Sequence, residues 1–307
     1  MIQKSEKIWM DGKLVNWDDA TVPILTHTLH YGLGVFEGIR CYEQADGSSA
    51  IFRLKEHIKR LYESAHMFTL EIPFTQDELI CASVELFKVN KLKSGYLRPL
   101  VYLGAGDMGL NYRDNPVKVA LANWTWGAYL GDEGLKNGIR GKVSSYTRLA
   151  PNVNLPKSKA CGNYINSILA KREVVRAGYE EAILLDAEGY ISEASGENVF
   201  IVKNGVVKTP PESSAILKGI TRDCIMTILK DQGVKVVEER FGRDEAYVAD
   251  EFFVTGTAAE ICPVCELDDR LIGTGKPGPI TQAVQKTFFN AVKGKAEKYK
   301  EWLTKVA

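Results

Sequence analysis

The stretch YISEASGENVFIVKNGVVKTPPESSAILKGITRD, residues 190–223, alternates short apolar runs with turn residues before a helical pattern begins. Residues 190–192 and 198–202 predict strands, and Lys203-Asn204-Gly205 predicts the turn after the second. Residues 219–232 have helical periodicity that ends at Gly233. Strands, turns and a helix in this order indicate a fold that mixes α and β structure.

Glu193 leaves an apolar strand among small residues, Ser192, Ala194, Ser195 and Gly196. A carboxylate in such a setting can be buried, and a buried carboxylate needs a cationic partner. A protonated pyridine ring would serve as that partner. The alternative is a solvated loop acid, and spacing by itself leaves both open.

Gly219-Ile220-Thr221 opens the helix that follows. A glycine at a helix start leaves backbone N–H groups unpaired, and the helix dipole favours an anion there. Gly256-Thr257, after an apolar run at residues 251–255, is a second small-residue turn of the same kind. Each pattern alone is also typical of ordinary helix capping or a tight turn.

The segment LPKSKACGNY, residues 155–164, places two lysines among small residues just before a helical pattern at 163–177. A lysine there can be a solvated charge, an anion contact or a nucleophile. Pyridoxal 5'-phosphate (PLP) chemistry requires a lysine for a Schiff base, a phosphate site, an acid near the pyridine nitrogen and a hydrogen bond to the ring oxygen. The chain offers a candidate for each requirement.

The combined pattern resembles the signature of the class IV (fold-type IV) PLP-dependent aminotransferases. It consists of Glu193-x-Ser195-x-x-Asn198-Val199-Phe200, Val207-x-Thr209 and Leu217-x-Gly219-Ile220-x-Arg222, and Lys159-x-x-x-Asn163-Tyr164 matches the lysine segment of the family. Residue types and gaps both agree, and the choice of Lys159 over Lys157 comes from this resemblance.

Within that family, four further stretches are similar to the branched-chain amino acid aminotransferases: His30 to Arg40, Tyr96-Leu97-Arg98-Pro99, Ala150-Pro151-Asn152 and Gly256 to Glu260. The resemblance runs from about residue 8 to residue 289. It implies an α+β fold of two α/β-type domains with the active site in the cleft between them.

The resemblance also implies roles for individual residues. Lys159 carries PLP covalently as a Schiff base and moves the proton, Glu193 keeps the pyridine nitrogen protonated, and Tyr164 bonds the ring oxygen. Phosphate binding falls to Arg60 with Ile220, Thr221 and Thr257. Substrate contacts fall to Tyr31, Phe36, Gly38, Arg40, Tyr96, Arg98, Met108, Trp126, Tyr129, Thr257 and Ala258. Among these, Arg98 with Tyr31 would accept a side-chain carboxylate, and Phe36, Met108, Trp126 and Tyr129 would form apolar walls.

The activity implied is a ping-pong transfer of the amino group of leucine, isoleucine or valine to 2-oxoglutarate, giving branched 2-oxo acids and L-glutamate. Other enzymes on this fold are alternatives: a D-amino acid or amine transaminase, or aminodeoxychorismate lyase. They differ in the regions around Phe36 and Arg98, which here have the branched-chain pattern. A scaffold without turnover would be expected to lack Lys159 or Glu193, and both are present.

Length and composition fit an enzyme of this kind. At 307 residues the chain favours two domains, for which we expect residues 1–126, an interdomain loop at 127–138, and residues 139–307. A formal net charge of zero does not indicate the excess of positive charge that is typical of proteins binding nucleic acid or an anionic membrane. Six cysteines in a chain of this length do not indicate a disulfide framework. We expect a cytoplasmic protein with small-molecule substrates, assembled as a homodimer or larger homo-oligomer.

The remaining periodicities predict further elements. We expect a hairpin at 6–17 turning at Asp11-Gly12, a strand at 35–42, helices at 54–68 and 75–92, strands at 96–103 and 117–126, and a last helix from 279 to 302. Cys262-x-x-Cys265 has no second pair to complete a zinc site, so buried thiols are favoured. His27 and His30 are interpreted as structural histidines, since no cluster completes a metal site around them.

Overall fold

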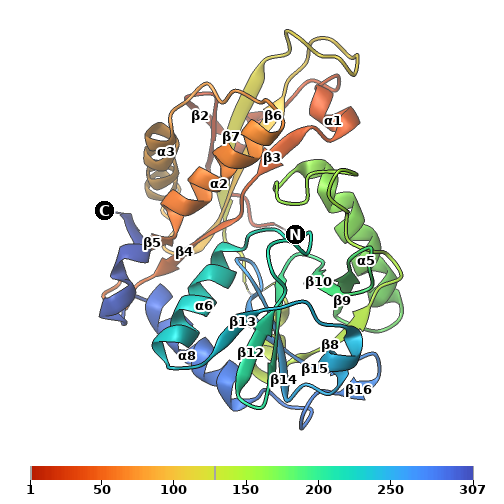
Figure 1. Cartoon of the computed structure of the whole chain (residues 1–307). Helices are drawn as coiled ribbons and strands as arrows, with labels where there is room; N and C mark the ends of the chain where they lie inside the picture. Colours follow the sequence, from red (N-terminus) through yellow and green to blue (C-terminus); the bar gives the residue numbers. More distant parts are fainter. Residues whose placement is uncertain (1, 128, 307) are drawn as a thin grey trace. The chain divides into compact units, whose positions relative to one another are not determined.

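The computed structural model describes residues 2–127 and 129–306. Contacts between Cα atoms divide the chain into two units, shown in Figure 1. Of the described residues, unit 1 holds 2–127, 158–162 and 291–306, and unit 2 holds 129–157 and 163–290. The predicted domain boundaries stay a prediction. Two segments beyond residue 126 belong to unit 1 because they form hydrogen bonds with its strands. Lys159 O accepts from Phe36 N, and the C-terminal strand pairs with residues 49–52.

Unit 1 is a mainly antiparallel sheet with helices. Its strands follow the order β17-β5-β4-β6-β7-β1-β2, and β3 also pairs with β6. The strands are β1 (Lys7–Met10), β2 (Lys13–Asn16), β3 (Gly34–Phe36), β4 (Ile39–Glu43), β5 (Ser49–Phe52), β6 (Gly95–Leu103), β7 (Val117–Trp124) and β17 (Leu303–Val306). The helices are α1 (His27–Tyr31), α2 (Leu54–Met67) and α3 (Gln76–Val89), with 3₁₀ turns η1 (Trp17–Asp19) and η3 (Glu297–Trp302).

The predicted hairpin is confirmed as β1 and β2. Asp11 and Gly12 both have positive φ, 46° and 88°. This is the conformation that a two-residue hairpin turn needs, and Asp-Gly adopts it at low cost. Asp11 Oδ1 also accepts a hydrogen bond from Val119 N at 2.9 Å, which ties the turn to β7.

The single strand predicted at 35–42 is divided into β3 and β4, and both pair with β6 in one register, Phe36 with Leu100 and Ile39 with Leu97. The interruption lies opposite Pro99. Glu37 N donates to Pro99 O at 2.9 Å, but proline has no N–H to return a bond. The ladder therefore opens at Glu37 and Gly38.

Helices α2 and α3 confirm the predicted amphipathic segments, and they contact each other and the strands of the sheet (Figure 1). The α2 face formed by Leu54, Ile58 and Leu61 is fully buried. Helix α3 begins at a capping box, in which Thr75 Oγ1 accepts from Glu78 N and the Glu78 carboxylate accepts from Thr75 N.

Unit 2 is a mixed sheet in the order β10-β9-β8-β15-β14-β11-β12-β13, with β16 beside β15. The strands are β8 (Ile139–Val143), β9 (Glu181–Leu185), β10 (Ile191–Ala194), β11 (Asn198–Lys203), β12 (Val206–Thr209), β13 (Val236–Glu238), β14 (Glu251–Gly256), β15 (Glu260–Leu267) and β16 (Arg270–Leu271). The helices are α4 (Gly131–Asn137), α5 (Tyr164–Arg176), α6 (Ile220–Asp231) and α7 (Arg243–Tyr247). The 3₁₀ turn η2 (Cys161–Asn163) and helix α8 (Pro279–Val292) lie where the chain passes from one unit to the other.

The centre of the unit 2 sheet is closed by aromatic packing. Phe200 on β11 and Phe253 on β14 are register partners, and their rings stack with centroids 5.0 Å apart. Both side chains are fully buried. Helix α5 packs on β9 and β8, and α6 lies beside α8, where Gln232 bonds Thr287 (Figure 1).

Three expectations about elements are corrected. The helix predicted from 279 to 302 ends at Val292, because Gly294 adopts φ 68° and redirects the chain into η3 and β17. Part of the stretch interpreted as a loop, 127–138, forms helix α4. Cys262 and Cys265 lie in strand β15, which the sequence patterns missed. Both thiols are buried, as predicted, and donate to carbonyl oxygens of Gly134 and Asn137 in α4.

Among the helices of residues 2–127 and 129–306, none has the length and apolar character needed to span a bilayer.

Candidate active site

Lys159 is held in unit 1 by its backbone. Lys159 N donates to Ser64 Oγ on α2 at 3.1 Å, and Lys159 O accepts from Phe36 N at 3.0 Å. Ala160 forms a bridge with Val35, so this segment extends the edge of β3. The Lys159 ammonium lies 5.2 Å from the centre of the Phe36 ring. Backbone pairing on both sides therefore orients the side chain of Lys159.

A buried charge cluster lies on the same face of α2. The carboxylate of Glu37, fully buried, accepts from Arg60 Nε at 2.7 Å, from Arg60 Nη2 at 2.9 Å and from His57 Nδ1 at 2.7 Å. His57, Arg60 and Ser64 are spaced at three and four residues, which places them along one stripe of the helix. The stripe joins Glu37 to the Lys159 segment.

The protonation of the cluster follows from its geometry. Burial alone would raise the pKa of Glu37, but the charge of Arg60 and the hydrogen bonds from Arg60 and His57 hold it well below its usual value. Burial lowers the pKa of His57, and it outweighs the attraction of Glu37. The ammonium of Lys159 also acts to lower it. The cluster is thus a carboxylate held by an arginine and a neutral histidine.

Arg98 projects among aromatic rings of unit 1. Its guanidinium carbon lies 4.7 Å from the ring centre of Phe36, 5.7 Å from that of Tyr96 and 5.9 Å from that of Trp124. Arg98 Nε is buried and has no hydrogen-bond partner among the described residues. A guanidinium with a buried, unused donor is suited to bind a carboxylate.

Tyr96 and Trp126 form the adjoining aromatic wall, with ring centres 4.7 Å apart and planes near 90°. Gly38 is required beside them, because a Cβ there would lie 1.8 Å from the hydroxyl of Tyr96. Arg40 donates to the carbonyl oxygens of Trp126 and Gly127, at 3.3 and 2.8 Å. Arg40 therefore contacts the backbone at the end of this wall.

Tyr31 and Met108 are also brought together in unit 1. The Tyr31 hydroxyl donates to Met108 O at 3.0 Å, and the ring of Tyr31 packs on His27. His27 Nε2 bonds the carbonyl oxygen of Gly109, and His30 Nε2 bonds that of Ile24.

Glu193, in β10 of unit 2, is buried next to an arginine. Its Oε1 lies 2.6 Å from Arg148 Nε, an ion pair in which the N–H is not aligned with the oxygen. Its Oε2 accepts from Leu217 N at 3.0 Å and from Asn198 Nδ2 at 3.4 Å. The signature residues Glu193 and Asn198 thus act together, and the alternative of a solvated loop acid is excluded by 5% exposure.

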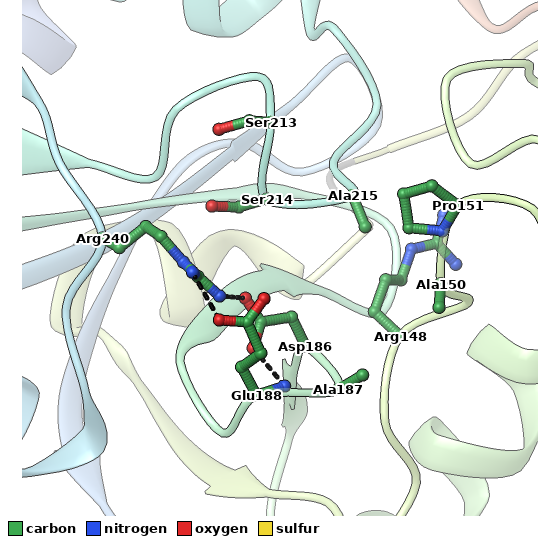
Figure 2. A pocket seen from close by; sticks show the side chains of 10 residues that line it. All are labelled: Arg148, Ala150, Pro151, Asp186, Ala187, Glu188, Ser213, Ser214, Ala215 and Arg240. Atoms are coloured by element: carbon green, nitrogen blue, oxygen red, sulfur yellow. Dashed lines mark hydrogen bonds and ion pairs between the residues drawn. The ribbon is translucent and has the colours of Figure 1, made fainter.

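A cavity of about 300 Å³ lies on the other side of Arg148. Figure 2 shows Arg148 beside Pro151 in one wall, and Arg240 in the opposite wall directed at Asp186 and Glu188. Arg240 bonds these two carboxylates at 2.6 and 2.8 Å. Arg148 therefore belongs both to the wall of this cavity and to the ion pair with Glu193.

The start of α6 has the form of an anion site. Gly219 is its N-cap, and no side chain caps the helix among the described residues. A Cβ at Gly219 would lie 1.9 Å from Asn198 Oδ1, so only glycine permits the close approach. Ile220 and Thr221 therefore present backbone N–H groups at a helix N-terminus, where an anion is favoured.

Four further predicted residues of unit 2 lie close in space. Tyr129 N donates to Ala258 O at 3.4 Å, in the turn that contains Thr257. Tyr164, at the start of α5, acts with the nearby carboxylates to raise the pKa of Tyr129, although burial is the largest cause. Tyr129, Tyr164, Thr257 and Ala258 thus belong to one neighbourhood.

Sequence reasoning assigned no role to Glu37, His57, Ser64 or Arg148. The helical spacing of His57, Arg60 and Ser64 was a usable signal, because a polar stripe on an otherwise apolar face needs buried partners. Arg148 carried no local signal, since its contact with Glu193 depends on the tertiary structure.

Comparison with known proteins gives concordant results. The family model described as "Amino-transferase class IV" matches residues 34–267. The branched-chain-amino-acid aminotransferase of Pseudomonas aeruginosa is 49% identical over 306 residues, which covers 100% of this chain and 99% of that protein. The crystal structure of the Escherichia coli branched-chain amino acid aminotransferase has a TM-score of 0.97 and 44% identity, covering 99% of this chain and 100% of that one. The enzyme of the same name from Thermobaculum terrenum, in its PLP form, has a TM-score of 0.93, 33% identity and 99% coverage of both chains.

Proposed function

Because the chain belongs to the class IV aminotransferase family, among its branched-chain amino acid aminotransferases, we propose that it moves the amino group of leucine, isoleucine or valine to 2-oxoglutarate with PLP as cofactor. The family, the fold class and the enzyme class predicted from the sequence are confirmed. The substrates, the ping-pong order and the residue roles below are our proposal.

The observation that carries the proposal is the buried carboxylate of Glu193. One of its oxygens is paired with Arg148, and the other accepts a hydrogen bond from Leu217 N. A carboxylate has lone pairs for several donors, so it can also accept a hydrogen bond from a protonated pyridine nitrogen. PLP, when bound, supplies the electron-withdrawing ring that makes the α-carbon of an amino acid acidic.

We assign the covalent and proton-transfer roles to Lys159. Its backbone is fixed by Ser64 and Phe36, so its amine can be returned to one position in each half-reaction. With PLP bound, the free amine of Lys159 would act as the base that accepts the proton from the substrate α-carbon and as the acid that later gives it back. Tyr164 donates to the ring oxygen of the cofactor in this assignment.

We assign phosphate binding to Arg60 with Ile220, Thr221 and Thr257. The uncapped start of α6 supports the backbone part of this role. Arg60 uses Nε and Nη2 on Glu37, and this pairing holds the guanidinium rigidly in place.

One pocket must accept an aliphatic side chain in one half-reaction and a carboxylate in the other. We propose that Arg98 with Tyr31 binds the side-chain carboxylate of 2-oxoglutarate, because Arg98 Nε has no hydrogen-bond partner among the described residues. Phe36, Met108, Trp126 and Tyr129 would enclose the aliphatic chain, with Gly38 and Arg40 supporting the wall. Tyr96, Thr257 and Ala258 would bind the α-carboxylate.

We also propose a homodimer or larger homo-oligomer. Unit 1 exposes Leu110 to 81% and Ile24 to 77%, and Leu29 on α1 is exposed as well. The hydrogen bond from Tyr31 to Met108 O joins the segment of Leu110 to α1. Exposed apolar side chains on joined segments are typical of an interface. Sedimentation velocity at micromolar concentration tests this, and a monomer would contradict it.

The experiment that tests the function is an absorbance spectrum of the PLP-loaded protein during two additions. L-leucine should remove the near-visible band of the bound cofactor, and 2-oxoglutarate should restore it. Lys159→Ala should abolish the cycle, whereas Lys157→Ala, at an exposed lysine two residues away, should keep it. A band that responds only to D-alanine or to an aryl amine would overturn the substrate assignment.

A further inference from the structure

A second buried acidic group lies in unit 2, and the proposed function assigns it no role. Glu181 begins β9 and Glu197 lies in the turn between β10 and β11, with 0% and 5% exposure. Two carboxylates buried together are costly unless cations or protons compensate them.

The charge of Glu181 is compensated by a nearby cation and by hydrogen bonds. One oxygen forms a close ion pair with Lys171 Nζ from α5. The other accepts from Ser195 Oγ at 2.5 Å and from Ala182 N at 2.9 Å. Burial acts to lower the pKa of Lys171, but the charge of Glu181 raises it overall. Glu181 and Lys171 therefore form a neutral pair.

Glu197 is left with weaker support. Its Oε2 accepts from Gly196 N at 3.0 Å. Burial, followed by the charge of Glu181, raises the pKa of Glu197 to about 8, against the opposing effect of Lys171. The group of Glu181, Lys171 and Glu197 is thus neutral when Glu197 is protonated and carries one negative charge when it is not.

This group packs against the turn proposed to bind the substrate α-carboxylate. A Cβ at Gly256 would lie 3.2 Å from Glu197 Cγ, so the Glu197 side chain packs on the backbone that leads into Thr257 and Ala258. Lys171 Nζ lies 5.3 Å from the centre of the Tyr129 ring, and Tyr129 N bonds Ala258 O. The buried group therefore contacts both the turn and the proposed pocket wall.

Three further ionisable side chains interact with Glu197, and each has its own partner or stays neutral. Glu193 also raises its pKa, and Glu193 is itself paired with Arg148. Tyr164 and Tyr129 interact with each other, and Tyr129 interacts with Glu197 and Glu181. The thiol of Cys262, on β15, has its own pKa raised, first by burial and then by Glu197 and Glu181, so it stays neutral.

We propose that Glu197 is a positioning residue whose protonation sets the affinity of the turn at Thr257–Ala258 for a substrate carboxylate. This rests on the proposed function. With Glu197 protonated, the uncharged group supports the turn and adds no repulsion. Loss of its proton places a negative charge behind the bound carboxylate, in surroundings where little solvent screens it, and weakens binding.

The test is the inhibition constant of 4-methylpentanoate against leucine turnover from pH 6.5 to 9.5. This inhibitor has no amino group and stays a carboxylate over the whole range. In the parent enzyme the constant should rise about fivefold or more through pH 8. In Glu197→Gln, which keeps a neutral side chain of the same shape, that rise should disappear. Glu180→Gln, at the exposed neighbour of Glu181, is the matched control and should keep it.

Glu181→Gln gives an independent check. Removing the charge of Glu181 and freeing Lys171 both lower the pKa of Glu197, so the rise should move to lower pH. A purely structural role of Glu197 would not predict that direction. If Glu197→Gln turns over leucine with the same pH-dependent inhibition as the parent, the inference is wrong while the proposed function stands. If the parent lacks turnover with leucine and 2-oxoglutarate, the proposed function itself fails.

Discussion

Arg148 is the residue on which the buried charge of Glu193 depends. Arg148→Gln removes the cation that pairs with this carboxylate, so we expect a loss of about 3 kcal/mol in the free energy of unfolding. Urea unfolding followed by circular dichroism measures it.

Arg240 provides the matched control in the same cavity wall (Figure 2). Its side chain is 34% exposed and pairs with Asp186 and with the exposed Glu188. Asp186 is buried, but it also accepts hydrogen bonds from Glu188 N and Tyr190 N. Arg240→Gln should therefore cost less than Arg148→Gln, because the Arg240 pairs are partly screened by solvent. Equal losses for the two variants would show that the buried Glu193 does not depend on Arg148.

Gly38 is a second position at which a single added carbon atom is expected to change activity. In Gly38→Ala the new methyl group would lie 1.8 Å from the Tyr96 hydroxyl, so Tyr96 must move. We expect kcat/KM for leucine to fall about tenfold or more, because a shift of about 1 Å in a binding group has effects of that size. Gly127→Ala is the control, since a Cβ there meets nothing within 4 Å. An unchanged kcat/KM in Gly38→Ala would remove Tyr96 from the proposed carboxylate site.

At the scale of elements, helix α3 depends on its first turn. Thr75→Ala removes the acceptor for Glu78 N and should destabilise the protein by about 1 kcal/mol. Gln76→Ala, at the exposed next position, should have almost no effect. Thermal melts of both variants and of Glu78→Ala measure this. In the capping box each side chain bonds the backbone of the other residue. The double variant of Thr75→Ala and Glu78→Ala should therefore lose less stability than the sum of the two single losses.

Helix α2 has a buried polar stripe and a buried apolar stripe. Leu54, Ile58 and Leu61 bury its apolar side, while His57 and Arg60 serve Glu37 and Ser64 holds the Lys159 segment. Because both stripes belong to one rigid helix, the packing of the core also fixes the position of Lys159.

At the scale of the whole molecule, the buried histidine makes stability depend on pH. The native pKa of His57 lies below its ordinary value of 6.5, so the unfolded chain binds more protons as the pH falls below that value. Stability should therefore decrease as the pH falls below 6.5, because the unfolded chain takes up a proton that the buried native His57 does not. His57→Gln, which keeps a donor for Glu37, should lack this part of the loss in urea titrations.

Glu37 contributes to the pH dependence of stability at lower pH than His57. Its native pKa is depressed below the ordinary 4.5, so its stabilisation is complete above that value and is lost as the pH falls further. A loss between pH 6.5 and pH 5 that is the same in the parent and in His57→Gln would contradict the assignment of a neutral buried histidine.

Local patterns were sufficient for most elements and for the family. The Asp11-Gly12 hairpin, the capping box at Thr75 and the apolar stripe of α2 each depend on neighbours within a few residues, so periodicity and turn chemistry predict them. The lysine segment and the signature around Glu193 identified the enzyme class, because their residue types and spacing together are specific.

Only the tertiary structure decided which charges meet. Lys159 N donates to Ser64 Oγ, which is 95 residues away in the sequence. Glu193 pairs with Arg148, and the side chain of Glu197 packs against Gly256. The same holds for β17, which follows the predicted last helix beyond Gly294 and pairs with β5. The physical reason is common to all of them. Burial, pKa and strand pairing depend on groups distant in the sequence, whereas helix and turn propensities depend on adjacent ones.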